Sequence, residues 1–146
     1  VSSCRRQVMI EAPLEAVWNL VGDPARYPEW AGNVLEVTGL ATVEEGATFR
    51  QKGRTPMGSQ TTTFVVDDLE DMHEIRLRCL QSGYYAHWLL TEARGETFAE
   101  VELGMEPTHV GYKAFDAMMG RRWYRRLAEN SLTGLAEVAS HETAEH

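Results

Sequence analysis

The residues after Pro107 form the feature that most limits the fold, because a helical pattern continues there for about thirty residues without an internal proline. Apolar side chains recur at three- and four-residue spacing, which is typical of one buried helical face. That face comprises Phe115, Met119, Trp123, Leu127, Ser131, Leu132, Leu135 and Ala139. The sequence therefore predicts a long amphipathic helix, followed from His141 by a polar tail, residues 141–146.

Most of the chain before this helix has the pattern of short β-strands. Runs rich in Val, Thr, Phe and Tyr alternate with turn residues at intervals of about ten residues, which is typical of antiparallel strands joined by hairpins. Thr55-Pro56-Met57-Gly58 and Arg94-Gly95-Glu96 are two of the predicted turns. The predicted strands lie near residues 4–11, 33–42, 46–55, 59–69, 73–82, 84–94 and 96–106.

Two short helices are predicted between the first and second strands. Pro13 suits the first position of a helix and Gly22 suits its end, while Asp23 suits the cap of a second helix that begins at Pro24. The first helix presents one apolar face, formed by Leu14, Val17, Trp18 and Val21. We expect Val17 and Trp18 to pack against the sheet.

This order of elements predicts an α+β fold in which a curved, seven-stranded antiparallel sheet wraps around the long carboxy-terminal helix. The pattern Asp23-x-x-x-x-Pro28-x-Trp30 resembles the opening of the START-like (SRPBCC) superfamily, in particular its polyketide cyclase/dehydrase branch. Gly46-Ala47-Thr48-Phe49 and Gly95-Glu96-Thr97 resemble further family positions, although Glu96 separates the glycine and threonine that many members have adjacent. The resemblance implies the helix-grip fold, with one ligand-binding domain over residues 1–140 and a cavity between sheet and helix.

Composition excludes several other classes. A net charge near −8 and a pI near 5.1 argue against a general nucleic-acid binder. Cys4 and Cys79 have no zinc-type spacing, and no apolar run approaches the ~20 residues needed to cross a bilayer. We expect no metal, no cofactor, no transmembrane segment and a cytoplasmic location.

A curved sheet and one helix leave space between them, which favours a small-molecule site. Strand alternation points Ile75, Leu77 and Cys79 inward in one strand, and Ala99, Val101, Leu103 and Met105 inward in the last. Residues 84–91 have two possible registers, of which we prefer the one without an ionisable group inside: Tyr84, Ala86, Trp88 and Leu90. His87 acts as an acid or base only in the other register.

The expected ligand-binding residues combine these strand positions with aromatic and methionine side chains. The resemblance implies that Tyr27 and Trp30 lie at the mouth of the cavity, where they either line a gate or pack in the core. Met118 and Met119 suit an adaptable cavity wall, although core packing is an alternative. The expected set is Tyr27, Trp30, Leu77, Cys79, Tyr84, Trp88, Val101, Leu103, Phe115, Met118 and Met119.

Four arginines, Arg121, Arg122, Arg125 and Arg126, fall along one side of the predicted long helix, and Glu129 follows Arg125 by four residues. One interpretation is a solvated face. The other is a partner site in which guanidinium groups bind phosphate, either on a lipid headgroup or on the pantetheine arm of an acyl carrier protein.

The leading hypothesis is a protein, monomeric or homodimeric, that binds a hydrophobic polyketide-, lipid- or ring-containing molecule. An enzyme of this kind would be a polyketide cyclase, aromatase or dehydratase, and it requires an inward pair of polar groups; no catalytic residue is identified. A lipid or quinone carrier requires an almost wholly apolar lining. A protein-interaction module requires an exposed apolar or basic patch over a filled interior.

Overall fold

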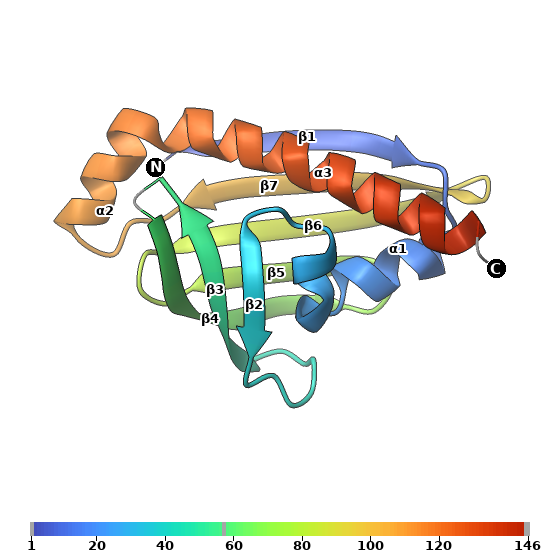
Figure 1. Ribbon diagram of the computed structural model, residues 1–146, viewed down its shortest axis with the longest axis horizontal. Helices are drawn as coiled ribbons and strands as arrows, with labels where there is room; N and C mark the ends of the chain where they lie inside the picture. Colours follow the sequence, from blue (N-terminus) through green and yellow to red (C-terminus); the bar gives the residue numbers. More distant parts are fainter. Residues whose placement is uncertain (1, 57, 145–146) are drawn as a thin grey trace.

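A computed structural model, which describes residues 2–56 and 58–144, shows one curved antiparallel sheet against a long carboxy-terminal helix (Figure 1). The sheet has seven strands in the order β1-β7-β6-β5-β4-β3-β2. They are β1 (Ser3–Ile10), β2 (Val34–Thr38), β3 (Thr48–Thr55), β4 (Gly58–Glu70), β5 (Glu74–Cys79), β6 (Tyr84–Ala93) and β7 (Glu96–Met105). The predicted strand set and the α+β helix-grip architecture are confirmed.

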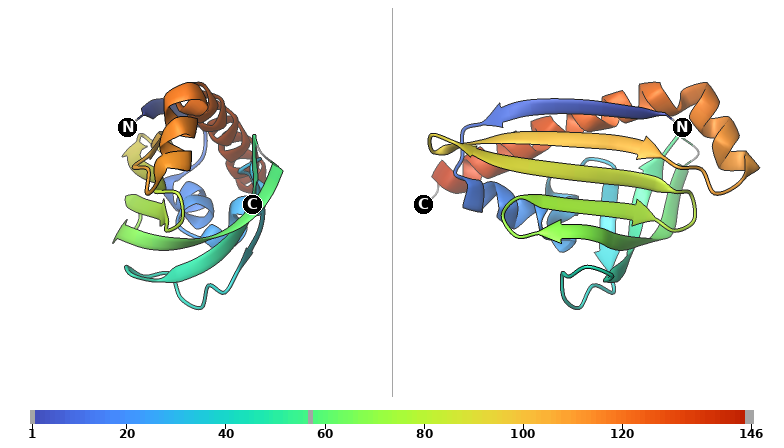
Figure 2. Two further views of the ribbon diagram at one scale, coloured as in Figure 1. Left: turned by 90° about the vertical axis from the view of Figure 1, so that its left-hand side faces the viewer. Right: turned by 180° about the vertical axis from the view of Figure 1, so that it is seen from behind.

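The sheet curls around the helices that it carries on one side (Figure 2). The end view of Figure 2 shows strands β2, β3 and β4 turning away from the direction of β1 and β7, so that the concave face surrounds α1 and the long helix. A bulge lies between Val66 and Asp68 in β4, and a second register shift lies in β2. Such bulges bend strands and increase their twist.

The two short helices predicted after the first strand are present as α1 (Leu14–Val21) and the 3-10 helix η1 (Pro24–Glu29). Pro13 is the residue that precedes the first helical turn, one position earlier than predicted, and Gly22 ends α1 as expected. The Asp23 side chain accepts a hydrogen bond of 3.1 Å from the Ala25 amide. The sequence alone predicted the ends of these two short helices, because capping interactions form within one helical turn.

The long helix contains an interruption that the periodicity did not predict. It consists of α2 (Val110–Phe115), a π-helical turn η2 (Asp116–Gly120) and α3 (Arg121–Ala144). A π turn carries more residues than an α turn, so it shifts which side chains face the core. Tyr124 is therefore fully buried, whereas Met119 is 48% exposed and Trp123 is only partly buried.

The carboxy-terminal segment is helical further than expected. Residues 141–144, predicted as part of a polar tail, continue α3, and Glu142 there forms an ion pair with Arg26 of η1. In the described residues no helix is long and apolar enough to cross a membrane, and no cluster of three metal-binding side chains occurs. Cys4 and Cys79 are both buried free thiols.

Aromatic side chains fill the middle of the space between sheet and helix. Trp30 packs edge-on against Trp88 at 5.3 Å and against Tyr27 at 5.2 Å between ring centroids. The preferred register of β6 is confirmed, because Ala86, Trp88 and Leu90 are buried. His87 lies on the opposite face, where its Nε2 is 2.5 Å from Glu74 Oε2, so it does not face the interior.

Candidate functional site

A small cavity remains at one end of the core, between the ends of β3 and β4, the β5–β6 turn and the start of the carboxy-terminal helix. Its volume is about 90 Å³. The lining residues share a position at this end of the fold: Asn33, Gln51, Gly53, Arg54, Thr55, Gln60, Thr62, Phe64, Cys79, Ser82, Tyr84, Met105, Tyr112, Phe115 and Trp123.

Four aromatic rings form a connected wall of this cavity. Tyr84 lies edge-on to Phe64 at 6.2 Å and to Trp123 at 6.0 Å, and Phe115 lies edge-on to Trp123 at 6.0 Å. Edge-to-face contacts of this kind stabilise a particular ring arrangement. The wall is therefore built from β4, β6 and both parts of the interrupted helix.

Among the polar side chains of the lining, the Tyr84 hydroxyl and the Gln51 side-chain amide lie toward the core and have no hydrogen-bond partner among the described residues. Gln51 is only 8% exposed. In the described part of the chain, every fully enclosed side-chain nitrogen or oxygen has a partner. The free groups of Tyr84 and Gln51 must therefore contact open space, and the cavity provides it.

Strand alternation explains how the sequence places these groups. In β3, Phe49 and Gln51 point inward, and in β4 Phe64 and Thr62 do the same. The two strands pair in register, with Phe49 opposite Phe64 and Gln51 opposite Thr62. Phe64 lines the cavity, and the Phe49 ring is stacked on it at 5.7 Å between centroids.

The lining of the cavity offers few groups that could act as an acid or a base. Its described residues include no His, Asp, Glu or Lys. Burial raises the pKa of Tyr84 well above its ordinary value near 10, because the charged phenolate loses its hydration. Tyr84 is thus a neutral hydrogen-bond donor at physiological pH, suited to a carbonyl or ether oxygen and unsuited to proton abstraction.

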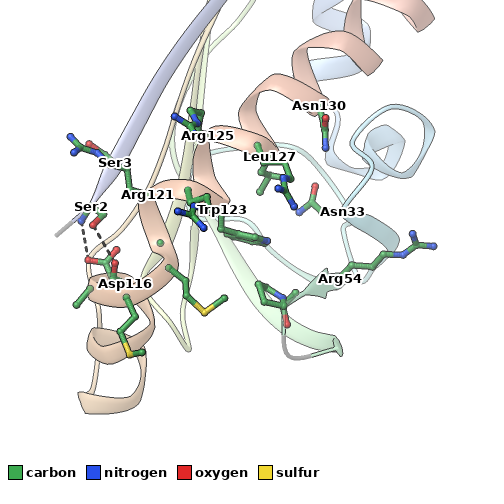
Figure 3. A pocket seen from close by; sticks show the side chains of 18 of the residues that line it. Ser2, Ser3, Asn33, Arg54, Asp116, Arg121, Trp123, Arg125, Leu127 and Asn130 are labelled. Atoms are coloured by element: carbon green, nitrogen blue, oxygen red, sulfur yellow. Dashed lines mark hydrogen bonds between the residues drawn. The ribbon is translucent and has the colours of Figure 1, made fainter.

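A second, much larger hollow of about 1260 Å³ lies next to the cavity and is open to the surface (Figure 3). Asn33, Arg54, Thr55 and Trp123 line both spaces. In Figure 3, Trp123 extends from α3 toward β3, and Arg54 lies on the far side of the hollow. The cavity and the hollow therefore adjoin one another at Trp123.

The hollow carries the arginines that the sequence singled out. Arg121, Arg122, Arg125 and Arg126 line it together with Arg54. Glu129 does not pair with Arg125 as its spacing allowed, because it faces Arg6 of β1 at 3.6 Å. Whether these arginines bind a lipid headgroup or an acyl carrier protein stays a prediction.

The structure brings together some of the predicted site residues and separates the rest. Cys79, Tyr84 and Phe115 line the cavity, and the exposed Met118 and Met119 line the hollow. The other predicted residues are buried outside both spaces: Tyr27, Trp30, Leu77, Trp88, Val101 and Leu103.

Tyr27 and Trp30 do not lie at the mouth of the cavity. The Tyr27 hydroxyl donates to the Val21 carbonyl at 2.7 Å, and Trp30 Nε1 donates to the Leu20 carbonyl at 3.2 Å. Both carbonyls belong to the last turn of α1, where intrahelical donors are lacking. The two aromatics therefore satisfy the end of a helix while they fill the core.

Sequence reasoning missed Gln51, Thr62 and Phe64, although a signal was present. Each lies in phase with an inward apolar residue of its own strand, as Gln51 does with Phe49. A glutamine in phase with a buried phenylalanine is the pattern of a polar group directed into an interior space. The alternation in β5, β6 and β7 alone predicted a cavity at the centre of the sheet instead.

Solved structures with the same architecture come from several bacteria. A chain described as the START superfamily protein from Mycobacterium smegmatis superposes with a TM-score of 0.69 at 17% identity, over 98% of this chain and 97% of that one. The protein TTHA0849 from Thermus thermophilus gives a TM-score of 0.72 at 18% identity, over 97% and 99% of the chains.

The di-domain aromatase/cyclase StfQ of the steffimycin biosynthetic pathway gives a TM-score of 0.65 at 19% identity, over 98% of this chain and 50% of its own. At these identities the likeness shows a shared fold. No curated protein sequence matches the chain. The family model described as "Polyketide cyclase / dehydrase and lipid transport" matches residues 3–140, and the chain therefore belongs to that family.

Proposed function

We propose that this protein binds a hydrophobic, ring-containing small molecule with its apolar ring in the cavity between Phe64, Tyr84, Phe115 and Trp123. The observation that carries the proposal is the combination of an aromatic wall with two polar groups that have no partner among the described residues. Ligand pockets are typically apolar with a few polar groups that fix orientation. Tyr84 and Gln51 supply such groups, and both suit a carbonyl oxygen.

The size of the cavity limits its occupant. Pockets that hold drug-sized ligands measure about 300–1,000 Å³, whereas this cavity measures about 90 Å³. One six-membered ring is the appropriate scale, with the rest of the molecule extending past Trp123 into the hollow. A fused polycyclic ligand requires the α2–η2 segment to move outward.

Catalysis as a cyclase, aromatase or dehydratase is the second candidate, supported by family membership and by the donor at Tyr84. Such an enzyme would orient a carbonyl-bearing chain and polarise its carbonyl. The lining favours binding and orientation over acid–base chemistry, because its described residues offer no carboxylate or imidazole. A lipid or quinone carrier requires an almost wholly apolar lining, and it agrees less well with this cavity because Gln51, Gln60 and Thr62 add polar groups to a mainly apolar lining.

Native mass spectrometry of the purified protein, followed by thermal unfolding with a panel of aromatic ketones, quinones and fatty acids, tests the proposal. A ligand present at 100 times its Kd stabilises the folded state by about 2.7 kcal/mol. That corresponds to a rise in Tm of about 5–10 °C for a chain of this size. No bound molecule and no shift with any compound would contradict the proposal.

A further inference from the structure

The arginines of the hollow have an unusual electrostatic setting for an acidic protein. None of the side chains of Arg54, Arg121, Arg122, Arg125 and Arg126 has a carboxylate within 4.0 Å among the described residues. The chain carries a net charge of −8, so carboxylates are plentiful elsewhere on it. Other arginines do find them: Arg78 pairs with Asp67 at 2.8 Å, and Arg26 pairs with Glu29 at 2.9 Å.

The acid among the described residues that line the hollow, Asp116, forms no ion pair with these arginines. Asp116 is 5% exposed, and its carboxylate accepts a hydrogen bond from the Ser2 amide at 2.9 Å (Figure 3). It also accepts one from the Tyr124 hydroxyl at 3.1 Å. No other Asp or Glu occurs among the described lining residues. The hollow therefore presents concentrated positive charge, which raises the local concentration of anions.

The arginines of the hollow lie next to the cavity in the fold. Trp123 and Arg54 line both spaces, and Trp123 is flanked in sequence by Arg122 and, two residues on, by Arg125. A ring held against Trp123 inside the cavity leaves its substituent directed to the arginine-lined side. The small cavity volume makes such an extension necessary for any ligand larger than one ring.

We propose that the ligand is an amphipathic anion, whose ring occupies the cavity and whose carboxylate or phosphate group is bound by the arginines of the hollow. This inference rests on the proposed function and adds the chemical class of the ligand. Guanidinium groups bind both anions through paired N–H donors, and charge-assisted hydrogen bonds of this kind are stronger than neutral ones. The exposed Met118 and Met119 provide an apolar surface beside that group.

Two probes of similar size test the inference, 3-phenylpropionate with a charged terminal group and 3-phenylpropanamide with a neutral one. Each has one ring, a two-carbon spacer and a carbonyl, and calorimetry gives the Kd of both. We expect the carboxylate to bind at least tenfold more tightly in 50 mM salt. Raising the salt concentration to 500 mM weakens binding of the carboxylate alone, because screening acts on exposed charges. Inorganic phosphate competes with the carboxylate and leaves amide binding unchanged.

The double substitution Arg121→Gln and Arg125→Gln should raise the Kd of 3-phenylpropionate about tenfold and leave that of the amide unchanged. Arg50→Gln is the matched control, because Arg50 is an exposed arginine on β3 outside the hollow. Equal affinity for the two probes would overturn the inference while leaving the proposed function intact. Binding of neither probe would overturn both.

A membrane surface is the competing explanation for basic residues beside exposed methionines. Vesicles of phosphatidylcholine with phosphatidylglycerol distinguish it in a sedimentation assay. If the double variant loses vesicle binding and the native protein shows no preference for the carboxylate probe, the arginines contact anionic lipid surfaces and the inference is wrong.

Discussion

The indole of Trp30 lies edge-on to the indole of Trp88, with ring centroids 5.3 Å apart and planes inclined at 85°. Trp30 comes from the end of η1 and Trp88 from the middle of β6, so the contact joins the short helices to the centre of the sheet. Two large rings fill the central interior. The open space is consequently restricted to the end of the fold where Tyr84 and Trp123 meet.

Trp30→Ala should lower the free energy of unfolding by about 3–5 kcal/mol, the usual cost of removing a buried tryptophan. Because Trp30 does not line the cavity, the Kd of 3-phenylpropanamide for the folded protein should stay within twofold of the native value. Urea unfolding and calorimetry measure the two quantities. Trp30→Phe, which retains one ring, should lose less stability. A large loss of affinity with little loss of stability would instead place Trp30 at a gate.

Gly134→Ala tests the close approach of α3 to the same tryptophan. A Cβ at position 134 would lie 2.2 Å from the Trp30 carbonyl oxygen, so the helix must move away from the backbone. We expect a loss of about 1–3 kcal/mol in urea unfolding, despite the better helix propensity of alanine. Gly32→Ala, where a Cβ meets nothing within 4 Å, is the control. Equal stability of the two variants would argue against the close contact.

Tyr84→Phe removes the hydroxyl assigned to ligand recognition. Since this hydroxyl has no partner among the described residues, stability should change by less than about 0.5 kcal/mol. The Kd of an aromatic ketone from the panel, whose carbonyl adjoins its ring, should rise about fivefold, the value of one net hydrogen bond. Tyr124→Phe is the opposite case, because the Tyr124 hydroxyl donates to the buried Asp116 carboxylate and its loss should cost mainly stability. An unchanged Kd for Tyr84→Phe would remove Tyr84 from the site.

Alkaline pH should destabilise the protein through its buried tyrosines. Burial raises the pKa of Tyr27 above its value near 10 in the unfolded chain, so the folded state favours the neutral phenol. The buried neutral tyrosine therefore contributes its full stabilisation to the folded state well below pH 10, and this stabilisation is lost as the pH rises above 10. The loss is about 1.4 kcal/mol per pH unit for each such tyrosine. Tyr27→Phe should reduce the slope of the unfolding free energy against pH by about half a proton at pH 10, rising to nearly one proton at pH 11. An identical slope in the two proteins would contradict the burial of Tyr27.

The fold was predictable from the sequence because its signals are local and repeated. Alternation in β5, β6 and β7 identified the inward residues, and the Asp23 cap and the Gly22 stop fixed the ends of short helices. The register of β6 followed from a single physical preference, the cost of burying the ionisable His87 rather than the apolar Trp88.

The lining of the candidate cavity was predictable only in part, because the position of the cavity depends on contacts between distant segments. Cys79, Tyr84 and Phe115 followed from periodicity, whereas the role of Trp30 depends on α1 carbonyls that lack helical donors. The π turn at Asp116–Gly120 moved Met119 outward and Tyr124 inward, and a stripe drawn at constant helical spacing contains no such shift.

Ligand is expected to bind at the end of the core rather than at its centre. Backbone amide chemical shifts in ¹H–¹⁵N spectra, followed during titration with 3-phenylpropanamide, distinguish the two positions. We predict that the largest changes fall on Gln51, Thr62, Tyr84 and Phe115, with small changes at Tyr27 and Trp30. The largest changes around Tyr27, Trp30 and Val101, with none at Gln51 or Tyr84, would contradict it.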